Sequence, residues 1–174
     1  MLALAALFAS VGNSAVHIAI PWLVLETTGS SANAGVVLGI SGFSVIFTAP
    51  IIGGLIAVLG ARPVSIWADI ISAGSVVLFP IVGTLFGLNL TSLLIIAIVG
   101  AMFDPAGATA RKSLIQAVAE RDGLSLIKFN GTYEAAATIG TVLGPTGAAL
   151  AISFVGINAT FYLIAIVFLM ASFL

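Results

Sequence analysis

Charged side chains are missing from three long stretches of this sequence. Its 174 residues include only five Lys and Arg and six Asp and Glu. None of these falls between Glu26 and Arg62, between Asp69 and Asp104, or after Glu134. About 20 apolar residues in a helix cross the hydrocarbon core of a bilayer, where a charge at mid-depth costs at least about 2.5 kcal/mol. The sequence therefore predicts an integral membrane protein.

The overall composition points the same way. Hydrophobic residues make up 61% of the chain and charged residues 6%, and the mean hydropathy is +1.30. Soluble domains carry about 25% charged residues. A closed β-barrel would need short segments in which apolar and polar residues alternate, and none of the long stretches alternates. We therefore expect an all-α membrane protein.

Clusters of Gly, Pro, Asn, Ser or charged residues interrupt the apolar sequence five times. Residues Met1 to Ser10 lack a basic leader, so we expect them to begin the first helix rather than form a cleaved signal. The whole chain, residues 1–174, is then a single transmembrane bundle. Six helices are predicted, at about Leu2–Leu25, Ala34–Leu59, Val64–Phe86, Ser92–Ala110, Leu126–Ile152 and Ile157–Leu174.

Lys and Arg gather beside two of the five breaks. The second break holds Arg62, and the other four cations lie in or just after the fourth break: Arg111, Lys112, Arg121 and Lys128. Six crossings would put these two breaks on the same side as both termini. Because cytoplasmic loops are enriched in Lys and Arg, we expect that side to be the cytoplasmic face of the cell membrane.

The fourth break is long enough to hold structure of its own. In the segment Arg111–Asp122, the apolar side chains of Leu114, Ile115 and Val118 share one helical face. This pattern predicts a short amphipathic helix that lies on the membrane surface.

A weak internal repeat relates the two halves of the chain. At a constant offset, the segment Ala49–Ile56 aligns with Gly144–Ala151, Gly12 aligns with Gly107, and Trp67 aligns with Tyr162. Each repeat, at about 1–86 and 91–174, would hold three helices, so the second would enter the membrane inverted. Inverted three-helix repeats are typical of secondary transporters, which bind substrate between the repeats near mid-bilayer.

Five short motifs resemble those of the major facilitator superfamily. Gly53-Gly54-Leu55, followed by Gly60-Ala61-Arg62-Pro63-Val64, is similar to the family's loop signature after the second helix. Gly140-x-x-x-Gly144-Pro145-x-x-Ala148-Ala149 resembles the antiporter motif of its drug exporters. Similarity to multidrug exporters of the tetracycline and aminoglycoside type comes from three further segments: Pro21-Trp22-Leu23-Val24-Leu25, Pro105-Ala106-Gly107 with Thr109-Ala110-Arg111, and Asn130-Gly131-x-Tyr133-Glu134.

The resemblance covers all six predicted helices and has two departures. Ala57 and Val58 stand where the family places an Asp and an Arg, whose salt bridges latch the two halves of the transporter together. Family members also have about twelve helices in two halves. The resemblance therefore implies half of a major facilitator fold, which needs a second six-helix half as its partner, either another copy of the chain or a C-terminal half.

Two polar groups lie inside predicted helices where ionisation is costly. His17 shares a helical face with Asn13, one turn away, and the pair either lines a cavity or hydrogen-bonds between helices. An imidazole in a cavity can exchange a proton near neutral pH. Glu134 lies two turns inside its helix, which suits binding and releasing a proton. The alternative for Glu134 is a fixed ion pair with Lys128 or Arg111.

The remaining charged positions near the cytoplasmic side have two interpretations each. Asp104 and Arg111 are seven residues apart and share a face if the helix continues through Pro105. They either anchor the cytoplasmic end of that helix or couple protons to transport. Asp69, two turns after Arg62, is predicted to belong to the cytoplasmic latch network rather than to a substrate site.

Gly140, Gly144 and Pro145 are explained by their effect on the backbone. Glycines four residues apart let a neighbouring helix approach closely, and a proline bends its helix locally. The motif is either ordinary small-residue packing or a rocking surface between the repeats.

No catalytic constellation is present. A single histidine excludes a His-x-x-x-His zinc site, and the sequence contains neither a nucleophile elbow nor a phosphate-binding loop. The cations are too few and too close to the membrane for nucleic-acid binding. We therefore expect no enzyme activity, no cofactor and no metal.

The leading hypothesis is half of a proton-coupled secondary transporter, which exports amphipathic small molecules, apolar or cationic, by alternating access. The expected proton-coupling residues are Glu134, Asp104 and His17, and the expected substrate contacts are Asn13, His17, Tyr133 and Thr141. The competing hypothesis is a truncated or degenerate half that serves as a structural or regulatory membrane subunit without transport of its own.

Overall fold

The structure is a computed structural model that describes residues 1–174, and every regular element in it is a helix. The helices are α1 (Leu2–Thr28), α2 (Ser31–Leu59), α3 (Ala61–Phe86), α4 (Leu90–Arg121) and α5 (Leu126–Phe173). All five are long and apolar enough to cross a membrane. The prediction of an all-α membrane protein is confirmed.

Local capping explains where the first helices end. Gly29 and Gly60 adopt positive φ angles of 67° and 86° at the ends of α1 and α2, a region that costs glycine no strain. Asn89 and Ser92 form a capping box at the start of α4, in which each side chain bonds the other residue's backbone N–H. These residues lie at or beside the first three predicted breaks.

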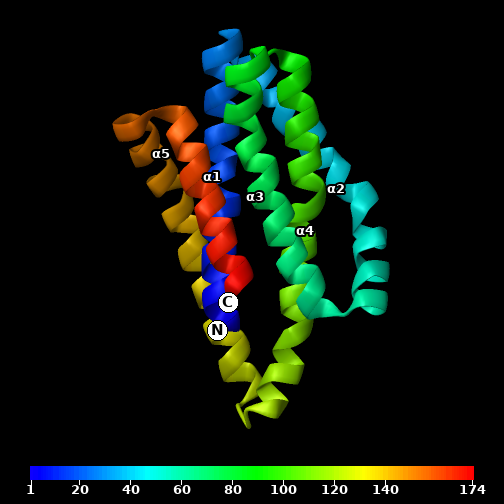
Figure 1. Ribbon diagram of the computed structural model, residues 1–174. Coiled ribbons are helices and arrows are strands. Elements are labelled where there is room, and N and C mark those ends of the chain that lie inside the picture. Colours follow the sequence, from blue (N-terminus) through cyan, green and yellow to red (C-terminus); the bar gives the residue numbers. More distant parts are fainter.

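One residue inside α5 is not helical. Gly156 has φ 82° and ψ 168°, a region essentially open only to glycine. At this residue the chain turns back, so that residues 126–155 and 157–173 form two arms that run in opposite directions (Figure 1). We call them the first and second arm of α5. The turn coincides with the fifth predicted break, and both chain ends lie at the same end of the bundle.

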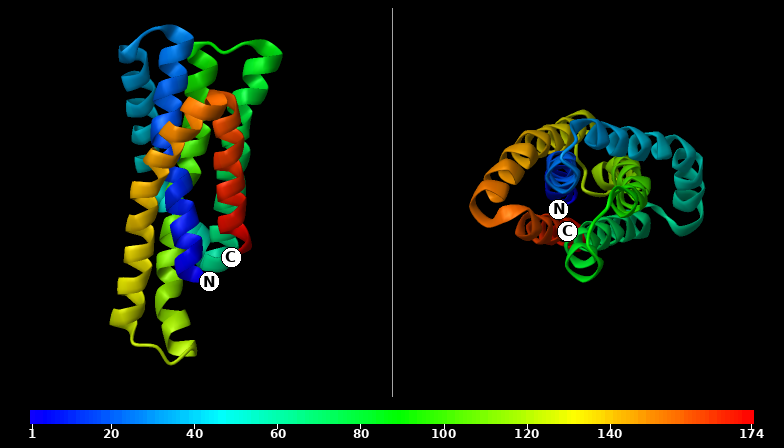
Figure 2. Two further views of the ribbon diagram at one scale, coloured as in Figure 1. Left: turned by 90° about the vertical axis from the view of Figure 1, so that its left-hand side faces the viewer. Right: turned by 90° about the horizontal axis from the view of Figure 1, so that it is seen from above.

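The predicted surface helix after Ala110 is wrong. Helix α4 instead continues through Pro105 to Arg121 without a break, because Ile115 and Ala119 are buried against the bundle rather than lying on a surface. Its 32 residues, at 1.5 Å each, give a length of about 48 Å, which exceeds the roughly 30 Å of a hydrocarbon core. The junction of α4 and α5 accordingly projects beyond the other helices (Figure 2).

Helices α1 and α4 lie inside a ring formed by α2, α3 and the two arms of α5 (Figure 2). The main core includes Ala19 of α1 and Leu93 of α4, both fully buried. Beside them, Phe79 of α3 stacks on Phe161 of the second arm with ring centroids 4.9 Å apart. Helix α2 has few buried residues and leaves a long apolar face uncovered, which includes Phe43 and Phe47.

Candidate functional site

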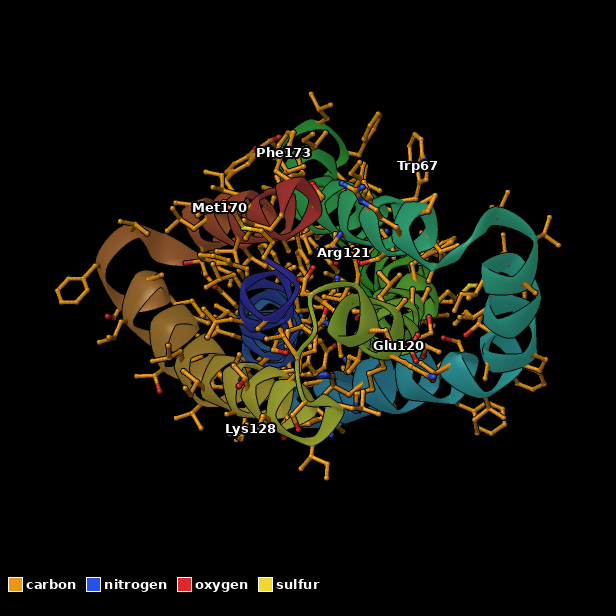
Figure 3. The ribbon with its side chains drawn as sticks, turned by 90° about the horizontal axis from the view of Figure 1, so that it is seen from below. Trp67, Glu120, Arg121, Lys128, Met170 and Phe173 are labelled. Atoms are coloured by element: carbon orange, nitrogen blue, oxygen red, sulfur yellow. The ribbon has the colours of Figure 1, made fainter.

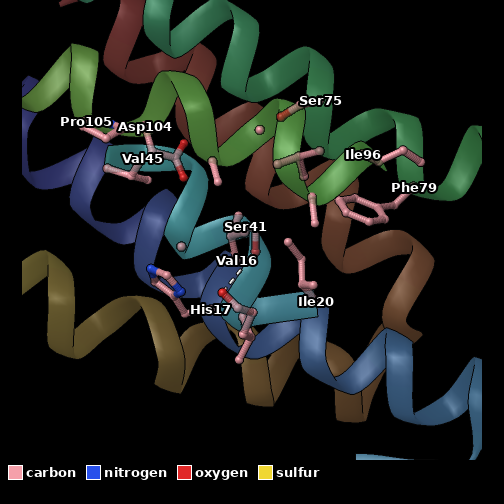
Figure 4. Close-up of a pocket in the computed structure, with 16 residues that line it drawn as sticks. Val16, His17, Ile20, Ser41, Val45, Ser75, Phe79, Ile96, Asp104 and Pro105 are labelled. Carbon is pink, nitrogen blue, oxygen red and sulfur yellow. Dashed lines mark hydrogen bonds between the residues drawn. The ribbon is translucent and has the colours of Figure 1, made fainter. Parts of the chain in front are cut away.

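A cavity of about 390 Å³ lies between α1, α2, α3 and α4. Its polar side chains are His17 of α1, Ser41 of α2, Ser75 of α3 and Asp104 of α4. His17 and Asp104 occupy one end, and apolar side chains such as that of Phe79 line the other (Figure 4). Ligand sites for small molecules are of this size and have this mixture of apolar walls and few polar groups.

The two ionisable groups of the cavity come from different helices. The carboxyl of Asp104 accepts a hydrogen bond of 3.0 Å from the hydroxyl of Ser72 on α3, and it forms no ion pair. His17 projects from α1 into the same space (Figure 4). Two of the three predicted proton-coupling residues therefore share one cavity.

A buried ion pair joins α3 to α4 next to this cavity. Arg111 Nη1 donates to Asp69 Oδ2 at 2.7 Å and to the hydroxyl of Ser65 at 3.1 Å. Gly107 makes room for the pair, because a Cβ at this position would lie 3.0 Å from Arg111 Nη2. Arg62 is exposed in the first turn of α3 and forms no ion pair, so Asp69 is paired with α4 instead.

Glu134 is paired with Lys112, at 2.9 Å between Oε1 and Nζ. Neither Lys128 nor Arg111, the two partners considered from sequence, forms this pair, because unbroken α4 carries Lys112 alongside the first arm of α5. The two side chains are 46% and 57% exposed, so Glu134 lies at the outside of this bundle rather than in the cavity.

The other predicted substrate contacts lie apart from the cavity. Tyr133 is buried in a small cluster with Ala6 and Ile115. Thr141 is exposed on the first arm of α5, where its hydroxyl donates to the carbonyl oxygen of Thr138. Asn13 has a buried side-chain oxygen that accepts no hydrogen bond.

The antiporter-like motif brings α5 against α1. A Cβ on Gly140 would lie 2.6 Å from the carbonyl oxygen of Leu7, and a Cβ on Gly144 would lie 2.5 Å from that of Val11. Only glycine permits this approach of the two backbones. Pro145 directly follows Gly144, and the helix continues through it.

The loop-signature glycines behave differently. Gly53 and Gly54 are exposed near the end of α2, with open space where a Cβ would be. Gly60 connects α2 to α3 through its positive φ. Ala57 and Val58, which lie between these glycines and Gly60, are also exposed.

Sequence reasoning missed the serines that bond across α3 and α4. Ser65 and Ser72 flank Asp69 at intervals of four and three residues, which puts all three on one helical face. A carboxylate flanked by hydroxyls on one helical face is the sequence pattern that could have indicated these contacts.

Comparisons with known proteins found a matching family and several relatives. The family described as the Major Facilitator Superfamily matches residues 2–174. Multidrug efflux pump Tap of Mycolicibacterium fortuitum is 36% identical over 155 residues, which is 87% of this chain and 38% of the pump. Multidrug efflux pump Tap of Mycobacterium tuberculosis (strain ATCC 25618 / H37Rv) is 34% identical over 167 residues, 94% of this chain and 40% of the pump.

The chain thus spans about two fifths of the length of these relatives. No solved structure gives a significant match.

Proposed function

Because the chain belongs to the Major Facilitator Superfamily, a family of transporters rather than enzymes, we propose that it is the six-helix half of a proton-coupled exporter of amphipathic small molecules. The observation that carries this proposal is the cavity that His17 and Asp104 both line, among apolar walls. A carboxyl and an imidazole can take up and release protons, and the walls suit a largely apolar solute.

The turn at Gly156 supports six crossings, since each arm of α5 is long enough to span much of a bilayer by itself. Two equivalent contacts support an inverted repeat. Gly12, in the first helix of one repeat, packs against Phe168 in the last helix of the other. Gly107, at the matching position of the second repeat, packs against Ala68 and Asp69 in the last helix of the first.

The relatives' length and the exposed faces support a partner half, which is another copy of the chain or a C-terminal half. Both α2 and the first arm of α5 expose apolar side chains, such as Phe47 and Val142, that such a half would cover. Alternating access would then arise as the two halves rock, with Gly140 and Gly144 holding α1 and α5 together as one body.

The substrate and proton roles follow from these positions. Asp104 and His17 act from the cavity, while Glu134 and Thr141 face the partner half from the exposed side of α5. Asn13 and Tyr133 contribute from within the bundle. Loose specificity is expected, because the apolar walls offer few directional contacts, and it agrees with the name multidrug efflux pump that the relatives carry.

Orientation in the cell membrane is proposed from the cations. Arg121 lines one groove with both chain ends, Met1 and Leu174. Figure 3 views this end of the bundle from below and shows Arg121, Lys128 and Glu120 there. Because Lys and Arg favour the cytoplasmic side, both termini are assigned to the cytoplasm.

The competing function is a membrane subunit without transport of its own, which the neutral Ala57 and Val58 favour because they cannot form the family's latch. To decide, the chain is reconstituted in liposomes with and without a C-terminal six-helix half, and dye efflux driven by a proton gradient is followed. We expect efflux from the combined halves, with a loss of at least about tenfold in Asp104→Asn and in Glu134→Gln.

Asp122→Asn, an exposed change outside the helices, is the matched control and should transport like wild type. If no combination transports, the subunit function is favoured. If efflux occurs but all three variants match wild type, proton coupling through Asp104 and Glu134 is wrong.

A further inference from the structure

Polar side chains fill the contact between α3 and α4. We define the α3–α4 polar layer by its members: Ser65, Asp69, Ser72 and Ser75 from α3, and Asp104 and Arg111 from α4. Two glycines of α4 create its space, since a Cβ on Gly100 would lie 3.0 Å from Ser75 Oγ and one on Gly107 would lie 3.3 Å from Asp69 Oδ1. The layer is therefore built into the sequences of both helices.

The polar layer extends from the cavity to a separate groove at the end of the bundle. At one end, Ser75 and Asp104 line the cavity that also holds His17. At the other end, Ser65 and Arg111 line a groove of about 600 Å³ between the ends of α1, α3, α4 and α5. Asp69 and Ser72 lie between these ends, on consecutive turns of α3.

The fixed charges of the polar layer do not balance. It contains two carboxyl groups, on Asp69 and Asp104, and one guanidinium, on Arg111. If both carboxyls were ionised, the layer would carry one net negative charge. Asp69 is buried and Asp104 is only partly exposed, so this unpaired charge would be poorly solvated and unfavourable. One bound proton makes it neutral.

No cation other than Arg111 forms an ion pair with either carboxyl. Met1, Arg62 and Arg121 line the groove at the far end of the layer, and none of them is paired with Asp69 or Asp104. His17 faces Asp104 from α1 but forms no ion pair with it, and Tyr133 of α5, next to Arg111, has no positive form. Helix α2 contains no ionisable residue. Lys112 of α4 is bonded to Glu134 outside the layer.

We propose that Asp69 and Asp104 share a single proton, with Arg111 as their common counter-charge. When the proton passes, the O–H bond of one carboxyl breaks and an O–H bond forms on the other, so the net charge of the layer stays at zero. Ser72 donates to Asp104 at 3.0 Å and lies one turn of α3 from Asp69, so the relay of the proton is assigned to its hydroxyl. Asp69 thus becomes a proton-carrying residue, and only its link to transport rests on the proposed function.

Infrared spectroscopy of the full chain in lipid nanodiscs at neutral pH tests the shared proton, through the carbonyl band of a protonated carboxyl. We expect a band equivalent to one group in the wild type. It should disappear in Asp69→Asn and equally in Asp104→Asn, since the remaining carboxylate then balances Arg111. In Arg111→Gln it should rise about twofold, because both carboxyls must then be neutral.

Glu134→Gln is the control and should leave the band unchanged, since Glu134 is half-exposed and paired with Lys112. A wild type without the band overturns the proposal, and this result needs no variant to fold. So does a full band in Asp69→Asn, which would mean that Asp104 holds the proton alone. These spectra require no transport, so a failure of the efflux experiment would leave them standing.

Discussion

Arg111 of α4 and Asp69 of α3 form an ion pair of 2.7 Å whose side chains are only 2% and 5% exposed. The pair sits one turn of α3 away from Ser72, which bonds the cavity residue Asp104. Its position ties the packing of two helices to the cavity in which transport chemistry is proposed. The ion pair that holds α3 to α4 therefore lies one helical turn from a residue that bonds to the cavity.

Removing one member of this pair should strongly destabilise the bundle. In Arg111→Ala the Asp69 carboxyl loses its donor inside the protein and must either stay unpaired or take up a proton, and breaking a buried pair in this way costs about 3–5 kcal/mol. The free energy of unfolding in mixed detergent micelles measures the loss. Lys112→Ala, which breaks the half-exposed pair with Glu134, should cost no more than about 1 kcal/mol. Equal losses in both variants would contradict the importance given to the buried pair.

The contact of α5 with α1 should not tolerate a methyl group. Gly144→Ala would place a Cβ 2.5 Å from the carbonyl oxygen of Val11, so the helices must separate. Overpacking of this kind costs about 1–3 kcal/mol. Gly147→Ala, three residues further along the same helix, meets open space and should be neutral or stabilising by up to about 1 kcal/mol. The free energies of unfolding of the two variants are measured side by side. Equal values would refute the close contact.

The turn at Gly156 should require glycine. Its φ of 82° and ψ of 168° strain any residue with a Cβ, at a cost of about 1–3 kcal/mol. Gly156→Ala is thus expected to lower the unfolding free energy by that amount. Gly74→Ala, in open space within helical α3, serves as the reference. A Gly156→Ala protein as stable as this reference would argue that α5 runs straight through the position.

Much of the helical pattern could be predicted from local sequence. Gly29, Gly60 and Asn89 are capping signals that act within a few residues, and they mark real helix ends. The end of α4 was mispredicted because Arg111 resembles the start of a charged loop. Its charge is instead neutralised by Asp69, on another helix, and no local pattern reveals that partner.

The site was predictable to a similar degree. Ionisable groups within apolar helices are conspicuous in sequence, so His17 and Asp104 could be named before their common cavity was known. The partner of Glu134 was missed because it depends on how α4 packs beside α5. The serines of the polar layer were missed for the same reason. Hydroxyls are common in membrane helices, and their role depends on which groups of a neighbouring helix they contact.

Six crossings, with both ends of the chain on one side, is the claim on which the rest of the account depends. The chain has no cysteine, so single-cysteine variants can be labelled with a membrane-impermeant maleimide without further changes. We expect Leu2→Cys and Phe173→Cys to react from the cytoplasmic side, and Phe86→Cys and Phe154→Cys to react only from the opposite side. If Phe173→Cys instead reacted from the side opposite to Leu2→Cys, the chain would cross the membrane an odd number of times, and the half-transporter architecture would be contradicted.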